Sequence, residues 1–258
     1  MAVVTYEVKN HVGYVTLNRP DVLNCFNYET LSVLQGIIDD IYTDKNVRVV
    51  IFMGAGEKAF SAGADLKERR SLSESEVKRN VKKIREVFSS VEALPQPTIA
   101  ALNGYAFGGG FELALACDFR YAVEGTKMGL TETSLGIIPG AGGTQRLPRL
   151  IGSAKALELV LTARKLTSEE AFDYGILNGV VKVEALVSQC EDLASEICKN
   201  APVAVQQAKF AVREGMNVDR HTGMAIESKA YEVTIPTKDR LEALEAFAEK
   251  RKPEFKGE

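Results

Sequence analysis

Short apolar runs alternate with longer stretches of helical spacing in the first half of the chain. Polar and apolar residues alternate through residues 3–8 and 12–17, which predicts two strands joined by a tight turn. Three further runs of mostly apolar residues predict buried strands, at residues 48–53, 98–102 and 119–123.

Helix signals separate these strands and then dominate the rest of the chain. Leucine and isoleucine recur three or four residues apart after Asn27, and the same spacing follows Ser73, whose partner Glu76 completes a capping box. Another helix is expected to begin near Phe111, directly after three glycines. Beyond residue 152 the pattern is almost wholly helical, with helices predicted at residues 154–162, 168–174, 185–199 and 202–214 and two more that reach residue 250.

The order of these elements predicts the fold class. Strands alternate with helices early and helices dominate late, so we expect an α/β core over residues 1–200 followed by a helical region over residues 201–258. A chain of 258 residues is long enough for one large core of this kind.

The charge balance gives no sign of a highly charged partner. The sequence has 32 basic and 35 acidic residues, a net charge of −3, so no global field recruits nucleic acid or an anionic membrane. The N-terminal stretch fits a first strand better than a signal peptide, and the most apolar region is interrupted by Asn103, Glu112 and Asp118. We therefore expect a cytoplasmic protein without a membrane span.

Cysteine and histidine leave little scope for metal or nucleophilic chemistry. The four cysteines include no C-x-x-C pair, which argues against a zinc site and against a disulfide framework and is typical of reduced cytosolic thiols. The two histidines, His11 and His221, fall in a predicted hairpin turn and near a predicted helix start. The sequence therefore predicts no metal site and no histidine-based triad.

Three glycine-rich segments need a chemical explanation: GAGEKAFSAGAD at residues 54–65, NGYAFGGGFE at 103–112 and IPGAGGTQR at 138–146. None has the spacing of a P-loop, and none has the strand, G-x-G-x-x-G, helix order of a dinucleotide site. The glycines could serve only tight turns and close helix packing. Two of the segments, however, end a predicted strand and open a predicted helix, where unpaired N–H groups can bind an oxyanion.

Two glutamates follow such stretches of backbone and are the candidate acid and base. Glu112 is the only charge between Leu102 and Asp118, which argues against an ordinary solvated carboxylate. Glu132 has weaker support from its neighbours, because Thr-Glu-Thr could equally form an exposed turn. Two carboxylates that share one water, beside N–H groups that hold an oxyanion, make an acid/base site without histidine, cysteine or metal.

These segments resemble the crotonase (enoyl-CoA hydratase/isomerase) superfamily over residues 18–258. The residues that carry the resemblance are AFSAGADLKE, NGYAFGGGFELALACDFRYA, GLTETSLGIIPGAGGTQRLPR and AFAEKRKPEFKGE. The resemblance implies an α/β fold in which a spiral of β-β-α turns is closed by a C-terminal helical trimerisation region. It also implies a homo-oligomer, either a trimer or a dimer of trimers.

The resemblance further assigns residues to roles. It implies that the N–H groups of Ala64 and Gly109 form an oxyanion hole and that Glu112 and Glu132 are the catalytic carboxylates. Gly140 matches a position that shapes the acyl end of the pocket. The remaining implied substrate contacts are Ala62, Asp65, Leu66, Lys67, Phe247 and Lys250.

The implied substrate is an acyl thioester of coenzyme A, which is part of the substrate and not a separate cofactor. Lys67 and Lys250 match basic positions that meet its phosphates, and Phe247 matches an aromatic near the acyl or pantetheine path. Both lysines could equally be ordinary surface charges. Arg19, Leu23 and Asn24 fall in a segment that lines the nucleotide side in relatives.

Within the superfamily the chain most resembles the methylglutaconyl-CoA hydratase subgroup of leucine breakdown. We therefore expect hydration of a short enoyl-CoA, with branched, carboxylated 3-methylglutaconyl-CoA as one candidate and Arg69 or Arg70 as the cation for its carboxylate. A double-bond isomerase is the nearest alternative, although isomerases typically lack the first glutamate. A catalytically silent or RNA-binding relative is another, but the basic residues of positions 78–85 are diluted by glutamates.

Overall fold

A six-stranded sheet forms the centre of the computed structural model, which describes residues 2–258. The strand order is β1-β2-β3-β5-β7-β10, and only the β1–β2 hairpin is antiparallel. The strands are β1 Val4–Lys9, β2 Val12–Leu17, β3 Val49–Gly54, β5 Thr98–Leu102, β7 Phe119–Val123 and β10 Gly179–Val181. The five strands predicted from the apolar pattern are confirmed.

A second, four-stranded sheet in the order β4-β6-β8-β9 is built from strands of two or three residues. These are β4 Ala59–Ser61, β6 Tyr105–Phe107, β8 Lys127–Gly129 and β9 Leu166–Thr167. The chain gives one strand to each sheet in turn, β3 then β4, β5 then β6, β7 then β8, before it enters a helical segment. The expected spiral of β-β-α turns is therefore confirmed.

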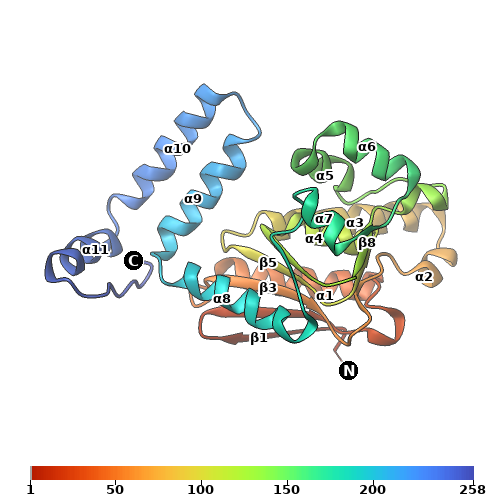
Figure 1. Cartoon of the computed structure of the whole chain (residues 1–258), viewed down its shortest axis with the longest axis horizontal. Helices are drawn as coiled ribbons and strands as arrows, with labels where there is room; N and C mark the ends of the chain where they lie inside the picture. Colours follow the sequence, from red (N-terminus) through yellow and green to blue (C-terminus); the bar gives the residue numbers. More distant parts are fainter. Residues whose placement is uncertain (1) are drawn as a thin grey trace.

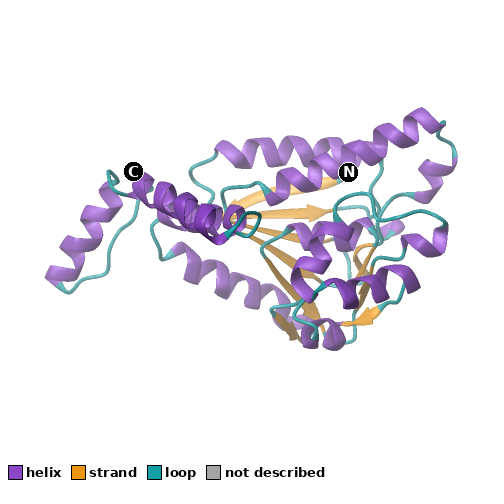
Figure 2. Cartoon of the chain, turned by 90° about the horizontal axis from the view of Figure 1, so that it is seen from above, coloured by secondary structure: helices purple, strands orange, loops and turns teal. Residues whose placement is uncertain are grey.

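Helices cover the large sheet on both faces (Figure 2). The N-caps predicted for two of them are correct, since Asn27 accepts a hydrogen bond from the Thr30 N–H group and Ser73 forms a capping box with Glu76. The core helices are α1 Tyr28–Thr43, α2 Leu66–Arg70, α3 Glu74–Glu92, α4 Gly109–Ala116, α5 Gly143–Ile151, α6 Ser153–Thr162, α7 Ser168–Asp173 and α8 Leu186–Cys198. Short 3₁₀ turns lie at η1 Pro20–Val22, η2 Glu132–Leu135 and η3 Val183–Ala185.

The helix α4 is the most deeply buried of these, because every one of its residues is buried. It packs against α3, α5 and β6. It begins at Gly109, two residues before the predicted start near Phe111, because the glycine run itself supplies the N-cap, Gly108, and the first turn. A glutamate on this helix, Glu112, is thereby carried into the core.

Three helices project from the core as a tail (Figure 1). They are α9 Pro202–Gly215, α10 Arg220–Thr234 and α11 Lys238–Glu249. The predicted boundary at residue 200 falls between the end of α8 and the start of α9, while the division into two domains stays a prediction. No helix among residues 2–258 is both long and apolar enough to cross a membrane.

Candidate active site

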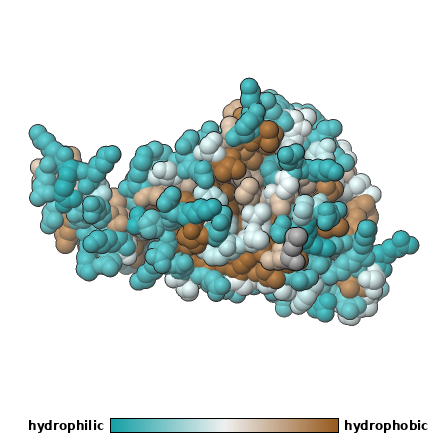
Figure 3. Space-filling view, turned by 90° about the horizontal axis from the view of Figure 1, so that it is seen from below, coloured by the Kyte–Doolittle hydropathy of each residue, from teal (hydrophilic) through white to brown (hydrophobic). Residues whose placement is uncertain are grey.

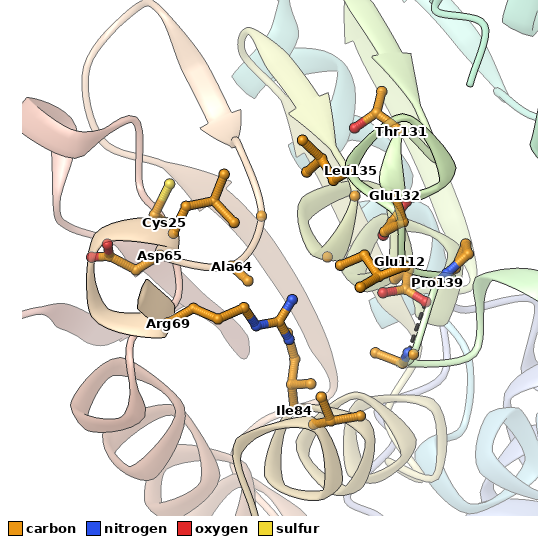
Figure 4. Close-up of a pocket in the computed structure, with 18 of the residues that line it drawn as sticks. Cys25, Ala64, Asp65, Arg69, Ile84, Glu112, Thr131, Glu132, Leu135 and Pro139 are labelled. Atoms are coloured by element: carbon orange, nitrogen blue, oxygen red, sulfur yellow. Dashed lines mark hydrogen bonds between the residues drawn. The ribbon is translucent and has the colours of Figure 1, made fainter. Parts of the chain in front are cut away.

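A cavity of about 1130 Å³ lies between α2 and α3 on one side and α4, η2 and the loop before α5 on the other. Figure 4 shows Glu112 and Glu132 on one side of it and Ala64 and Asp65 on the opposite side. Eleven residues predicted from the sequence line it: Leu23, Ala62, Ala64, Asp65, Leu66, Lys67, Arg69, Gly109, Glu112, Glu132 and Gly140. The fold therefore gathers three separate glycine-rich segments around one space.

Two backbone N–H groups at this cavity are free to bind a ligand. The N–H groups of Ala64 and Gly109 donate no hydrogen bond to another part of residues 2–258, and Gly109 is the first residue of α4, so it has no acceptor within the helix. The two segments approach closely because Gly63 has a φ of +94° and no side chain. A Cβ there would lie 2.7 Å from the carbonyl oxygen of Phe107 and 3.1 Å from the nitrogen of Gly109. This pair of donors at the positive end of a helix suits an oxyanion.

Glu112 is held in place by two backbone N–H groups. Its carboxylate oxygen Oε1 accepts hydrogen bonds from the nitrogens of Ala141, at 2.8 Å, and Gly143, at 2.9 Å. One hydrogen bond of Glu112 is drawn in Figure 4. Burial raises the pKa of Glu112, and the two N–H groups and the nearby Arg146 oppose that increase. The pKa of Glu112 stays raised overall, and the two hydrogen bonds favour the ionised form of its carboxylate against the effect of burial.

Glu132 differs from Glu112 in its hydrogen bonding. It is 8% exposed, and its oxygen Oε2 is buried without a hydrogen-bond partner among residues 2–258. Burial, followed by the charge of Glu112, raises the pKa of Glu132 to about 7. A Cβ added at Gly108 would lie only 3.0 Å from Glu132 Oε1, so this carboxyl lies against the N-terminal end of α4. Two buried carboxyls with different hydrogen-bond partners thus face one cavity.

The carboxylate of Asp65 has structural partners within the chain. It caps α2 by accepting hydrogen bonds from the nitrogens of Lys67 and Glu68, and it forms an ion pair with Arg19 at 3.0 Å. Burial alone would raise the pKa of Asp65, but these hydrogen bonds and the Arg19 charge outweigh it and lower the pKa. These contacts fix the chain directly after Ala64.

The remaining residues of the predicted nucleotide side divide into two groups. Leu23 lines the cavity, and the exposed Leu66 and Lys67 lie at its rim. Arg19 and Asn24 do not line it. The amide nitrogen of Asn24 instead donates to the carbonyl oxygens of Ala55 and Ala59, so this side chain ties loops together.

The sequence predicted Arg69 as a candidate cation for an acyl carboxylate, and the structure places this residue in the lining of the cavity. Its side chain forms no ion pair or hydrogen bond within residues 2–258, and Figure 4 shows it reaching from α2 into the cavity. Its charge opposes the increase in the pKa of Glu132. Arg70, the alternative cation, is exposed and does not line the cavity.

Sequence reasoning missed several residues of this site. The N–H groups of Ala141 and Gly143 were not foreseen as partners of Glu112, although the GAGG run was a possible signal for closely approaching backbone. The apolar wall was missed as well, because it combines one face of α3 with the last residue of η2 and the loop that follows. Its residues are Val77, Val81, Ile84, Leu135, Ile137, Ile138 and Pro139.

Two predicted contact residues lie elsewhere in this chain. Phe247 is 86% exposed on α11, and Lys250 follows as the C-cap of that helix with a φ of +56°. Neither lines the cavity, and Figure 1 shows α11 at the far end of the tail.

Comparison with known proteins identifies the family. A family profile described as "Enoyl-CoA hydratase/isomerase" matches residues 7–258. The chain belongs to this family. The YngF protein of Bacillus subtilis (strain 168) is 53% identical over 255 residues, which cover 98% of each chain. The mitochondrial methylglutaconyl-CoA hydratase of Homo sapiens is 49% identical over 246 residues, 94% of this chain and 73% of the human protein.

Solved structures agree with this family assignment. The crystal structure of an enoyl-CoA hydratase from Bacillus anthracis is similar with a TM-score of 0.97 and 51% identity, and the match covers 99% of this chain and 100% of that one. The resemblance to the crotonase superfamily and the α/β fold with C-terminal helices are therefore confirmed, while the trimerisation role of those helices stays a prediction. These comparisons show that the protein is an enzyme of the enoyl-CoA hydratase/isomerase family.

Proposed function

We propose that this enzyme is a hydratase, which adds water across the α,β double bond of a short-chain enoyl-CoA. One observation carries the proposal: two buried carboxyls that differ in hydrogen bonding, Glu112 and Glu132, face the same cavity beside two free N–H groups. An isomerase moves a double bond with one carboxylate. A hydratase needs two carboxyl groups, because one must accept a proton from water and the other must donate a proton to Cα.

The reaction follows from these groups. Glu112 accepts a proton from water as the water oxygen forms a bond to Cβ, and the π electrons move onto the thioester oxygen. The N–H groups of Ala64 and Gly109 stabilise this oxyanion, and each such donor typically contributes about 3 kcal/mol to the transition state. Glu132 then donates its proton to Cα. We assign the base role to Glu112, because two hydrogen bonds favour its ionised form.

A direct assay separates the two activities. A hydratase causes loss of the absorbance of a conjugated 2-enoyl-CoA thioester, whereas an isomerase causes a gain of that absorbance from a 3-enoyl-CoA. We expect a rapid loss of this absorbance with 2-enoyl-CoA and little gain of it with 3-enoyl-CoA. The reverse result would assign the enzyme to the isomerases.

We further propose a substrate whose acyl chain ends in a carboxylate, such as 3-methylglutaconyl-CoA. The name of the human relative supports this choice, and so does Arg69, a cation without an ion pair that reaches into the cavity. A second carboxylate buried without a partner would cost several kcal/mol, so a cation is needed near the acyl end. Arg69 fits this requirement better than the exposed Arg70.

Replacement of Arg69 by methionine tests this choice. The wild type should have a higher kcat/KM for the carboxylated thioester than for crotonyl-CoA, and Arg69→Met should reverse the order by lowering only the first value. Arg70→Met is the matched control and should keep the wild-type preference. Equal or better use of crotonyl-CoA by the wild type would indicate a general short-chain hydratase.

We propose that coenzyme A binds along the rim formed by Ala62, Leu66 and Lys67, and that Phe247 and Lys250 contribute from another copy of the chain. This arrangement is supported by the apolar residues that the tail leaves exposed. Examples are Val212, Met216, Met224 and Tyr231, each at least 61% exposed, and they line a cavity of about 600 Å³ between α9 and α10. Apolar patches are also visible on the surface seen from below (Figure 3). A trimer or a dimer of trimers would cover such surfaces.

We propose no metal ion and no cofactor beyond the coenzyme A part of the substrate. The two glutamates and the two N–H donors supply the proton transfers and the oxyanion stabilisation that hydration requires. We also propose the cytoplasm as the compartment, which is supported by four cysteines that are all free thiols.

A further inference from the structure

A network of ion pairs connects the helical tail to the backbone that holds Glu112. It starts on α9, where Lys209 and Arg213 contact Asp118 at 2.7 Å and 2.8 Å. Arg213 also contacts Glu92, the last residue of α3, at 2.9 Å. Glu92 then contacts Arg146 on α5 at 2.6 Å. Positive and negative groups alternate along this network.

Arg146 occupies the end of the network nearest the active site. Its nitrogens Nε and Nη2 donate to Glu92 Oε2, and Nη1 donates to the carbonyl oxygen of Ala141 at 2.7 Å. The side chain is only 11% exposed. It folds back over Gly142 so closely that a Cβ at that glycine would lie 2.0 Å from Nη1. Arg146 is therefore fixed by three hydrogen bonds in a tight space.

The carbonyl group that Arg146 binds lies between the two donors to Glu112. The N–H of Ala141 belongs to the peptide unit before this carbonyl, and the N–H of Gly143 belongs to the peptide unit after it. Gly142, between them, has a φ of +106°. The hydrogen bond from Arg146 to the peptide unit between Ala141 and Gly142 therefore fixes the direction of both N–H groups.

The charges of the network also favour a fixed Arg146 and an ionised Glu112. Burial alone would raise the pKa of Glu92, but the guanidinium groups of Arg146 and Arg213 outweigh it and lower the pKa. Glu92 thus remains ionised and holds both arginines. Arg146 also opposes the increase that burial causes in the pKa of Glu112. Its positive charge favours the ionised form of the proposed base.

We propose that Arg146 is a positioning residue for Glu112, and that Arg213 on α9 supports it through Glu92. The tail is thereby coupled to the geometry of the active site within one chain. Arg146 contacts neither substrate nor reacting atoms in this arrangement, because it acts through the backbone of Ala141. The inference rests on the proposed hydratase reaction with Glu112 as base.

Two replacements of Arg146 separate its geometry from its charge. Arg146→Lys keeps the charge but loses the planar three-bond contact, so kcat should fall by about tenfold or more while KM changes less than about threefold. Arg146→Met should lower kcat at least as far. It should also move the acidic limb of the pH profile of kcat/KM to higher pH, because the pKa of Glu112 rises without the neighbouring cation.

Arg149 provides the matched control. It lies on the same helix, is exposed, and within residues 2–258 its side chain donates a hydrogen bond only to the Gln145 carbonyl oxygen. Arg149→Met should keep the wild-type kcat and pH profile. If Arg146 had a purely structural role, its replacement would lower the melting temperature and the active fraction but would not move the acidic limb of the pH profile. A folded Arg146→Lys or Arg146→Met protein with the wild-type kcat and the wild-type acidic limb would overturn the inference.

Arg213→Met tests the link to the tail. It should lower kcat in the wild-type background but have little further effect in the Arg146→Lys background, because the two act through one path. Independent, multiplying effects would overturn the link. Failure of the wild type to hydrate any enoyl-CoA would instead contradict the proposed function, so the two failures are distinguishable.

Discussion

At the scale of single residues, Glu112 and Glu132 carry the same chemical group in environments that differ in hydrogen bonding. Glu112 accepts two backbone hydrogen bonds, and Glu132 has a buried oxygen without a partner among residues 2–258. Replacing either by glutamine keeps the shape and removes the proton transfer. We expect each single variant to lose at least about 10²-fold in hydration rate, the range typical of acid/base groups.

The double variant Glu112→Gln, Glu132→Gln tests whether the two act together. Residues that act on one water fail as a unit, so the double variant should be scarcely worse than the slower single variant. Circular dichroism and a thermal melt serve as the folding controls. Hydration close to the wild-type rate in either folded single variant would contradict its assignment.

The pKa of Glu132 also predicts how stability depends on pH. It is raised from 4.5 to about 7, mainly by burial, so between these values the folded protein holds a proton that the unfolded chain has released. The stability that this proton provides is complete below pH 4.5 and is lost as the pH rises through about 7. Glu132→Gln stays neutral throughout. We therefore expect the melting temperature of Glu132→Gln to rise relative to that of the wild type as the pH increases from 5 to 8.

Glu124 is an exposed glutamate and provides the control for this measurement. The difference in melting temperature between Glu124→Gln and the wild type should stay nearly constant over the same range. A difference for Glu132→Gln that is flat or shrinks toward pH 8 would show that the buried carboxyl is not neutral in the folded protein.

At the scale of elements, the N-terminus of α4 provides one of the two oxyanion donors. Gly109 is the first helical residue, a position that tolerates proline because its N–H group has no partner within the helix. Gly109→Pro removes this donor and should lower kcat by about 10²-fold or more. Initial rates on a 2-enoyl-CoA, together with a thermal melt, measure the effect.

Gly109→Ala is the matched control for the added bulk. Its Cβ would lie 3.1 Å from Ile84 Cδ1, so it introduces the crowding that a Cβ causes but keeps the N–H group. We expect it to retain most of the activity. Equal losses in the two variants would mean that crowding, and not the missing donor, explains the result.

The elements also show what the sequence could predict. The five long strands and the capped helices were recovered because their patterns are local, as with Asn27 and Ser73. The second sheet was not, because its strands have only two or three residues and show no period. The helix α5 was missed as well, since it starts in glycines and contains Pro148.

The site residues that lie in recognisable sequence motifs could be predicted. The contacts that form only when the chain folds could not. Glu112, Glu132, Ala64 and Gly109 stand in recognisable segments, and the fold brings all four to one cavity. The N–H partners of Glu112 lie 29 and 31 positions away in the chain, and only the folded arrangement reveals them. The location of Phe247 on a distant tail is another property of the fold that no local pattern contains.

At the scale of the whole molecule, α11, which carries Phe247, and α2, which lines the cavity, lie at opposite ends of one chain (Figure 1). If Phe247 and Lys250 contact acyl-CoA, they do so in another copy, and the protein must be an oligomer. We expect a trimer or a multiple of it by light scattering. Phe247→Ala, Lys250→Ala should then raise KM strongly, because both changes remove contacts to the bound thioester and not to the reacting atoms.

Mixed oligomers provide the decisive experiment for this arrangement. Subunits with Glu112→Gln have an intact tail, and subunits with Phe247→Ala, Lys250→Ala have an intact pair of glutamates. Each protein alone should be nearly inactive at low substrate. Random co-assembly should recover about a quarter of the wild-type rate, since half the sites keep Glu112 and half of those meet an intact tail from a neighbour. If the tail acted within its own chain, no mixed site would be complete, so an absence of recovery in verified mixed oligomers would contradict the shared site.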